Sequence, residues 1–413
     1  MIDVEEELAR ILSGGLIVSR YQPIVRLSSG TIAGFEALAR GPQGSLLEFP
    51  DRLFAAARHA RCLDTLDAAC RAAALAGAAT SAIADGATLF VNTEPDTSAR
   101  AMVGTYDSLL ATGGGSRVVF EFTERALTAR PADVLEATEQ LRRLGAGIAL
   151  DDVGIDPRSL ALLAFLQPDV VKLDLSIVQG ARTQRAARVM HAVGAYAERS
   201  GAAIVAEGIE TPEHLAIALS LGATHGQGWL FGRPEPAPDT LGITEPLEAW
   251  APVPEPATGQ TAFQMVVAAG RPVQTADKAL LYSLSRQLEL HALSLGDECV
   301  ALSNLQRAEH LTPTTAARYA QLAEQTAFCG LIGSGVPDEP APGVRGGSYS
   351  FDDPLAREWS VVVISPHFSA AMLACDLGDD VPDMQRRFSY CLTYDRPLVA
   401  QAARALMSSV ANR

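Results

Sequence analysis

The sequence predicts an α/β barrel over residues 1–250, followed by a smaller α+β domain over residues 251–413. Three observations support this prediction. Before residue 250, eight short β-like runs alternate with helical patterns, which is typical of a barrel of parallel strands. Residues 233–261 are rich in proline and show little periodicity, as expected of a linker. The chain has 413 residues, more than most single domains contain.

The predicted barrel strands are short apolar runs bounded by turn residues. They cover residues 16–24, 31–38, 88–92, 117–122, 147–152, 170–174, 203–207 and 226–231. Helical patterns fill most of the gaps, for example 53–76 and 132–144, and a proline stands at the start of the second.

The second domain is predicted from a different order of elements. Helices are expected at 277–293, 312–325 and 397–410, and strands at 298–304, 358–365 and 370–377. A loop rich in glycine and proline is expected after the second of these helices, as far as Gly347. This mixture of helices and strands indicates an α+β domain.

Composition excludes several classes of protein. The formal charge of −15 argues against non-specific nucleic-acid binding, which needs a basic surface. No apolar run is long enough for a membrane span, and the N-terminal residues are acidic where a secretory signal is basic, so a cytoplasmic protein without membrane contact is expected. The six cysteines form no CxxC motif, and buried reduced thiols are expected rather than a redox pair.

Polar side chains recur at the ends of the predicted barrel strands. They are Glu36, Asn92, Glu121, Asp151, Asp152, Lys172 and Glu207. Each alone is as well explained by a solvated surface charge. Together they predict a shared site, because the carboxyl ends of barrel strands meet on one face. Burying a carboxylate costs several kcal/mol unless it is paired or bound to a metal ion.

The chemistry of this set is narrow. Carboxylate and amide oxygens without neighbouring His or Cys suit Mg²⁺ or Mn²⁺, and an adjacent pair such as Asp151 and Asp152 can contact two ions. Two such ions activate water for phosphodiester hydrolysis. Lys172 would orient the water or neutralise phosphate charge; the alternative is an ion pair with a neighbouring carboxylate.

Seven ordered motifs within residues 11–234 resemble the EAL family of cyclic di-GMP phosphodiesterases. They are YQPIVRLSSGTIAGFEALAR, FVNTEP, FEFTE, LDDVG, PDVVKLD, VAEGIET and HGQGWLFGRP. The family fold resembles a TIM barrel in which one strand runs antiparallel. The resemblance implies that cyclic di-GMP is opened to linear pGpG with two Mg²⁺ or Mn²⁺ ions.

The resemblance also implies a role for each matching residue. The implied metal ligands are Glu36, Asn92, Glu121, Asp151, Asp152 and Glu207. The implied catalytic residues are Lys172, Glu207, Gln227 and Glu36. The implied substrate-binding residues are Gln22, Leu38, Arg40 and Pro234, and Glu124 would anchor the sixth loop. Homodimers are common in the family, so a homodimer is a further expectation.

The stretch after the aspartate pair departs from the family. The family has a loop of the type DDFGTGYSSL where this chain has DDVGIDPRSL, and Pro157 removes an N–H donor there. No Trp follows EALAR, since Gly41 and Pro42 stand in its place. We therefore expect an active phosphodiesterase and keep two alternatives: a cyclic di-GMP receptor without turnover, and a scaffold that binds no ligand.

Four segments of the second domain resemble the DICT sensory domain. They are SLSRQLE, the EW–VVV strand, AMLACDL and RRFSYCLTYD. This resemblance implies that the domain senses a ligand or a protein and regulates the barrel. It identifies neither the ligand nor a binding residue.

Overall fold

The computed structural model describes residues 4–94, 103–104, 106, 117–180, 183–248, 250 and 259–411. The chain splits into two compact units: Met1–Leu127, Glu136–Ile155 and Pro168–Pro252 form the first, and Thr128–Leu135, Asp156–Gln167 and Val253–Arg413 form the second. The predicted boundary between residues 250 and 251 adjoins residues 249 and 251–258, which lie outside the described residues.

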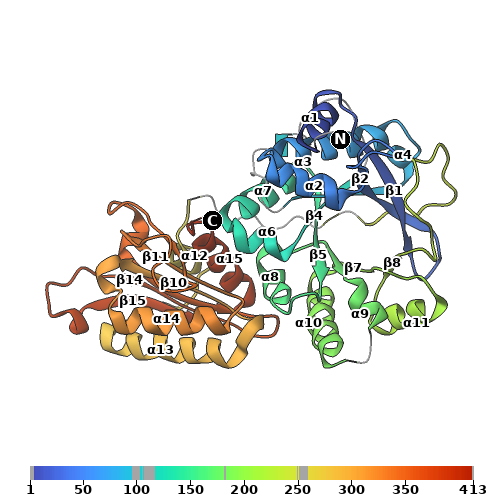
Figure 1. The fold of residues 1–413 in the computed structure, drawn as a ribbon. Helices are drawn as coiled ribbons and strands as arrows, with labels where there is room; N and C mark the ends of the chain where they lie inside the picture. The colour runs from blue at the N-terminus through green and yellow to red at the C-terminus, as the bar shows by residue number, and fades with distance from the viewer. Residues whose placement is uncertain are drawn as a thin grey trace. The chain divides into compact units, whose positions relative to one another are not determined.

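Eight strands close into a barrel in their chain order (Figure 1). They are β1 Val18–Arg26, β2 Ile32–Arg40, β3 Thr88–Asn92, β4 Arg117–Phe122, β5 Gly147–Val153, β6 Val170–Leu173, β7 Ala203–Ala206 and β8 His225–Gln227. Neighbours from β2 to β8 are parallel, whereas β1 runs antiparallel to both β2 and β8. The predicted barrel is confirmed, including one antiparallel strand.

The helices of this part of the chain follow the strands. They are α1 Val4–Ser13, α2 Pro50–His59, α3 Leu63–Ala79, α4 Ile83–Gly86, α6 Glu124–Ala129, α7 Pro131–Arg143, α8 Ser159–Leu166, α9 Leu175–Gln179, α10 Gln184–Ser200 and α11 Pro212–Ser220. Local sequence explains several starts. Prolines stand in the first turns of α2 and α11, and the hydroxyls of Thr183 and Thr211 cap α10 and α11.

The single helix predicted for residues 53–76 is wrong, because the structure has two helices, α2 and α3. Arg61 adopts a left-handed conformation (φ 54°), which ends one helix before the next begins. Both helices bury apolar residues, among them Leu53 and Leu66, in one cluster. Their apolar positions therefore read as one continuous helical pattern.

An apolar layer fills one end of the barrel interior. Ile24, Phe90, Val119, Ala149, Val170 and Val205 form it, one from each of six strands, together with Leu247. Side chains two residues apart on a strand point to the same side, so the next inward position follows two residues later. At those positions the sequence has Asn92, Glu121, Asp151, Lys172 and Glu207. The barrel thus places a charged layer directly above an apolar one.

The second unit contains a seven-stranded mixed sheet in the order β12-β11-β10-β13-β14-β15-β9. The strands are β9 Gln274–Asp277, β10 Val300–Arg307, β11 Phe328–Ser334, β12 Arg345–Gly347, β13 Glu358–Ile364, β14 Ser369–Asp376 and β15 Arg387–Thr393. The helices are α12 Ala262–Ala268, α13 Lys278–Leu295, α14 Pro313–Gln325 and α15 Arg396–Met407. Short 3₁₀ helices are Gly296–Glu298, Ala308–His310, Pro354–Arg357 and Asp383–Gln385.

Helices cover both faces of this sheet. Figure 1 shows α13 and α14 on one side and α12 and α15 on the other. Leu288 of α13 and Tyr319 of α14 pack with Val361 and Met372 of the sheet in one apolar cluster. Every residue of β13, the central strand, is buried, as expected of a strand covered on both faces. The expected sheet-and-helix domain is confirmed.

Five elements after residue 259 were not predicted. α12 and β9 precede the first predicted helix, the predicted loop before Gly347 contains β11 and β12, and β15 follows the last predicted strand. β9 is polar and β11 is buried along its whole length, so neither shows the alternation that indicates a strand. As expected, all six cysteines are free thiols, four of them buried. Every helix in the described part of the chain is too short or too polar to span a bilayer.

Candidate active site

Lys172 lies at the centre of the charged layer. Its side chain is buried, and its Nζ atom lies 2.7 Å from Glu207 Oε1, 2.8 Å from Glu121 Oε1, 3.1 Å from Asp151 Oδ1 and 3.5 Å from Glu36 Oε2. These four carboxylates come from four different strands or strand ends. One ammonium group therefore holds together side chains that are as much as 171 positions apart in the sequence.

Asp151 and Asp152 both reach the site because β5 is irregular there. Leu150 pairs with Val171 and Val153 with Leu173, so two aspartates on β5 stand opposite the single residue Lys172 on β6. In a regular strand adjacent side chains point to opposite sides. The β-bulge, with Asp152 in a left-handed conformation (φ 57°), changes that alternation.

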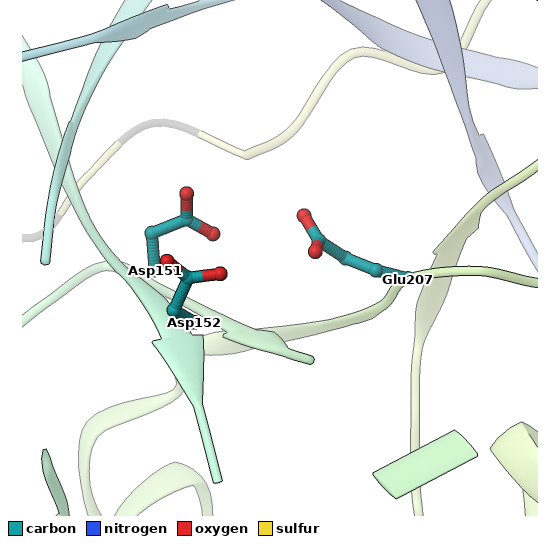
Figure 2. A group of neighbouring side chains, drawn as sticks. All are labelled: Asp151, Asp152 and Glu207. Carbon is teal, nitrogen blue, oxygen red and sulfur yellow. The ribbon is translucent and has the colours of Figure 1, made fainter. Parts of the chain in front are cut away.

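Figure 2 shows the consequence of the bulge. The carboxylates of Asp151 and Asp152 project from the end of β5, and Glu207 extends toward them from the segment that follows β7 (Figure 2). One ligand oxygen from each of the three lies within 4.8 Å of the others. These residues form a group that could hold a metal ion, and they are three of the six predicted metal ligands.

A second set of contacts fixes Glu36. Asn92 Nδ2 donates to Glu36 Oε1 at 2.8 Å, and Gln227 Nε2 donates to Glu36 Oε2 at 2.7 Å. Gln227 Nε2 also lies 3.2 Å from Gln22 Oε1, and Gln22 Nε2 donates to the carbonyl of Gly232 at 3.1 Å. Amides from β1, β3 and β8 thus orient one carboxylate on β2.

Burial and charge change the pKa values of these acids in different directions. Burial raises the pKa of Glu121 well above its usual range, against the attraction of Lys172. Burial, opposed by Lys172, raises the pKa of Glu207 to about 8. Burial and repulsion from Asp151 raise the pKa of Asp152 to about 6. For Glu36, burial is outweighed by Lys172 and the hydrogen bonds from Gln227 and Asn92, so its pKa is lowered.

The group is short of positive charge. It contains the carboxylates Glu36, Glu121, Asp151, Asp152 and Glu207. Among the described residues, Lys172 is the cation that forms ion pairs with four of them, all except Asp152. Glu121 Oε2 is buried without a hydrogen bond. Four negative charges therefore remain when all five acids are ionised, and two divalent cations fit this deficit.

The other predicted site residues have the following places in the fold. Leu38 and Arg40 are on β2, Pro234 follows β8, and Glu124 is the first residue of α6. Arg40 Nη1 donates to the carbonyl of Ala39 at 2.8 Å, and burial followed by repulsion from Arg20 lowers its pKa. Glu36 lies inside β2 rather than at its end, because pairing with β1 extends the strand to Arg40.

Two features of the site were not predicted from the sequence. The first is the chain of amides from Gln22 through Gln227 to Glu36, which depends on the antiparallel pairing of β1 with both of its neighbours. The second is the bulge at Asp152, for which two adjacent acids after an apolar run are the one visible hint. His225 lies in the barrel wall, where its Nδ1 contacts Thr224 Oγ1 at 2.9 Å and burial lowers its pKa to about 4.

Known proteins are similar in sequence to the barrel. The chain is 33% identical over 236 residues to the cyclic di-GMP phosphodiesterase RocR of Pseudomonas aeruginosa. This alignment covers 56% of this chain and 60% of that protein. It is 33% identical over 249 residues to the cyclic di-GMP phosphodiesterase NbdA of the same organism. This alignment covers 57% of this chain and 31% of that protein. The chain thus spans less than two thirds of the length of either relative.

A solved structure shares the fold. The EAL domain of FimX from Pseudomonas aeruginosa, bound to c-di-GMP, matches with a TM-score of 0.50 and 21% identity, covering 57% of this chain and 98% of that chain. At this identity the likeness concerns the fold alone.

Two family models match the chain. Residues 259–377 match the sensory domain of diguanylate cyclases and two-component systems, DICT, and residues 5–234 match the EAL domain. Since the match to the EAL domain spans more than half of the sequence, the chain belongs to the EAL domain family.

Proposed function

We propose that this chain hydrolyses cyclic di-GMP to linear pGpG at the charged layer of its barrel. The observation that supports this most is the placement of Lys172 among four carboxylates, with Asp152 completing a group of five acids. The EAL relatives RocR and NbdA are named cyclic di-GMP phosphodiesterases, which supports the same substrate.

The proposed metal ligands are the acids and the amide of this group. They are Glu36, Asn92, Glu121, Asp151, Asp152 and Glu207. We propose two Mg²⁺ or Mn²⁺ ions, because hard oxygen ligands without His or Cys suit these metals. When bound, such ions activate water and neutralise charge on the phosphodiester.

The reaction requires a water oxygen to bond to phosphorus while the bond from phosphorus to the 3′ oxygen breaks. The water gives up a proton to a carboxylate or to solvent, and the 3′ oxygen leaves with a proton. Lys172 keeps a positive charge beside these oxygens and holds the acids in place. Gln227 keeps Glu36 oriented, and Gln22, Leu38, Arg40 and Pro234 are proposed to contact the nucleotide.

A second candidate function is a cyclic di-GMP receptor without turnover. The observation that favours it is the altered stretch from Asp151 to Leu160, which contains Pro157 and the exposed Ile155. If this loop fails to keep Asp152 in place, the site retains Arg40, Gln22 and most of the acids but loses one ligand. Such a chain would bind the nucleotide and signal through a partner.

Chromatography separates these two functions. Purified chain is incubated with cyclic di-GMP and Mn²⁺ or Mg²⁺, and the product is analysed for pGpG, with Glu36→Ala as the control. The proposal predicts pGpG from the unmutated chain and at least about a 100-fold lower rate from the control. Absence of product, together with micromolar binding by calorimetry, would instead establish the receptor.

We further propose that the second unit senses a ligand or a protein and regulates the barrel. The match of residues 259–377 to the DICT sensory domain supports this proposal. Homodimer formation stays a prediction, which sedimentation of the purified chain can test.

A further inference from the structure

The turn that follows the aspartate pair contains unusual backbone. Asp152 has a φ of 57° and Gly154 a φ of 107°. A Cβ atom at Gly154 would lie 2.5 Å from Ile177 Cγ1, so this position requires glycine. Residues 152–155 therefore adopt a conformation that most sequences avoid, and some contact must hold them there.

Little of that support comes from the turn itself. The N–H of Ile155 donates to the carbonyl of Asp152 at 3.2 Å, and the N–H of Asp174 donates to the carbonyl of Val153 at 3.1 Å. Val153 is buried, but the side chain of Ile155 is 55% exposed and cannot anchor the turn by packing. Hydrogen bonds to the carbonyls of Gly154 and Ile155 come from outside the turn.

Arg185 provides that partner. It is the second residue of α10, and its Nη2 donates to the carbonyl of Gly154 and, at 2.6 Å, to the carbonyl of Ile155. Both contacts lie within the first compact unit. A guanidinium group that bonds two consecutive carbonyls restrains the peptide between them.

The place of Arg185 in its helix points to the same role. The first turn of a helix carries partial positive charge and favours acidic residues. The first turn of α10 has no acidic residue, and Thr183 already caps it through the N–H of Ala186. An arginine here is electrostatically unfavourable unless other contacts offset the cost. The two carbonyls of the turn are such contacts.

We propose that Arg185 is a positioning residue for Asp152. It holds the carbonyls of Gly154 and Ile155, and through this turn it keeps the Asp152 carboxylate with those of Asp151 and Glu207. The inference rests on the proposed function, because Asp152 is proposed as a ligand of the second ion. It explains how a loop with an altered sequence still places that ligand.

Calorimetry of Mn²⁺ binding to the full chain without nucleotide tests this role directly. Arg185→Gln is expected to weaken the weaker Mn²⁺ site by about tenfold, the size of effect typical for residues that orient metal ligands. Arg185→Lys, which keeps the charge but not the planar geometry of the Nη2 donors, should lie between Arg185→Gln and the unmutated chain. Arg52→Gln is the matched control, because Arg52 is an exposed arginine in the first turn of α2.

A kinetic comparison separates positioning from general damage to the fold. With Arg185→Gln, the Mn²⁺ concentration for half-maximal rate should rise about tenfold, while KM for cyclic di-GMP at saturating Mn²⁺ stays within about twofold. Hydrogen exchange of residues 153–158 should quicken in this variant but not in Arg52→Gln. Should Arg185→Gln fail to fold, Arg185→Lys alone must show the weaker Mn²⁺ site.

The outcomes are distinguishable from failure of the proposed function. Mn²⁺ binding within twofold of the unmutated chain for both Arg185 variants would overturn this inference and leave the proposed function intact. A different result would overturn the proposed function and support the inference. In that result the unmutated chain forms no pGpG but binds Mn²⁺, and Arg185→Gln weakens this Mn²⁺ binding. No Mn²⁺ binding by the unmutated chain would overturn both.

Discussion

Lys172 shows how a single residue type can decide the electrostatics of a site. The chain contains 33 lysines and arginines, yet only Lys172 and Lys278 are lysines. An ammonium group is a compact charge with three donors, and it can approach carboxylates from several directions. The planar fork of an arginine suits one carboxylate at a time. Four carboxylates within 3.5 Å of one Nζ atom therefore call for lysine.

Replacing this ammonium should affect both activity and stability. Lys172→Met leaves five acids without their counter-charge, and we expect the rate of cyclic di-GMP hydrolysis to fall by at least about 100-fold. Without metal the variant should unfold at a lower temperature at pH 8 than at pH 5, because protonation relieves the repulsion at low pH. Assays of pGpG and thermal unfolding measure the two effects.

Lys278→Met is the matched control for this change. Lys278 pairs with Asp383, and both residues belong to the second unit. If it loses activity as severely as Lys172→Met, the assigned role of Lys172 is wrong.

We expect Glu358 to make the stability of the second unit depend on pH. Burial raises its pKa to about 7, although the Thr261 hydroxyl and the N–H of Phe263, at 3.2 Å, donate to its carboxylate. Because the pKa of Glu358 is higher in the folded chain than in the unfolded chain, the folded state is favoured at a pH below the pKa of the unfolded chain. This stabilisation is lost as the pH rises to 7. We expect the second unit to lose about 1–3 kcal/mol between pH 4.5 and 7.

Hydrogen exchange of the β13 amides can measure this loss. Glu358→Gln should remove most of the dependence in that interval, whereas Glu309→Gln, at an exposed residue, should retain it. An unchanged pH dependence in Glu358→Gln would show that another group is responsible.

At the scale of elements, the turn after β5 determines whether the site is complete. The sequence predicts both the strand and the acids at its end, because apolar alternation and adjacent charges are local patterns. It does not predict that Asp151 and Asp152 point the same way. That depends on a bulge defined by pairing with β6 and on the contact with Arg185, and both partners are distant in sequence.

A substitution in this turn tests its fixed geometry. Gly154→Ala combines an unfavourable φ with a clash against Ile177, and we expect a loss of about 1–3 kcal/mol in the free energy of unfolding. Mn²⁺ binding should weaken as well. Denaturant unfolding and calorimetry measure the two effects.

Two glycines supply the controls. Gly222 also has a positive φ, 82°, but open space around it, so Gly222→Ala isolates the backbone cost. Gly194 lies inside α10 with open space, and its change to alanine should be neutral or stabilising. If Gly154→Ala is as stable as Gly222→Ala, the side chain of Ile177 can move aside at little energetic cost.

At the scale of the whole molecule, the barrel was predicted better than the second unit, for a physical reason. Its strands are short apolar runs separated by turn residues, so a local pattern identifies them. In the second unit β9 is polar and β12 has three residues, which leaves no such pattern. The direction of β1 and the break between α2 and α3 depend on pairing and packing, so local patterns did not reveal them.

Removing Val253–Arg413, the C-terminal part of the second unit, tests the proposed division of labour. A chain that ends after Trp250 should still bind cyclic di-GMP but hydrolyse it at a changed rate. Trp250 must be kept, because its Nε1 donates to the carbonyl of Gly145 at 3.2 Å and Leu247 belongs to the apolar layer of the barrel. Calorimetry and the pGpG assay compare the two chains. Complete loss of binding would mean that the two units fold as one.

The number of Mn²⁺ ions bound per chain is the most direct test of the central claim, that five acids and one lysine form a two-metal site. Calorimetry at pH 8.5, above the pKa of about 8 for Glu207, should find two ions for the unmutated chain and one for Asp152→Asn. Binding of no ion, or an equal number for both chains, would contradict the claim.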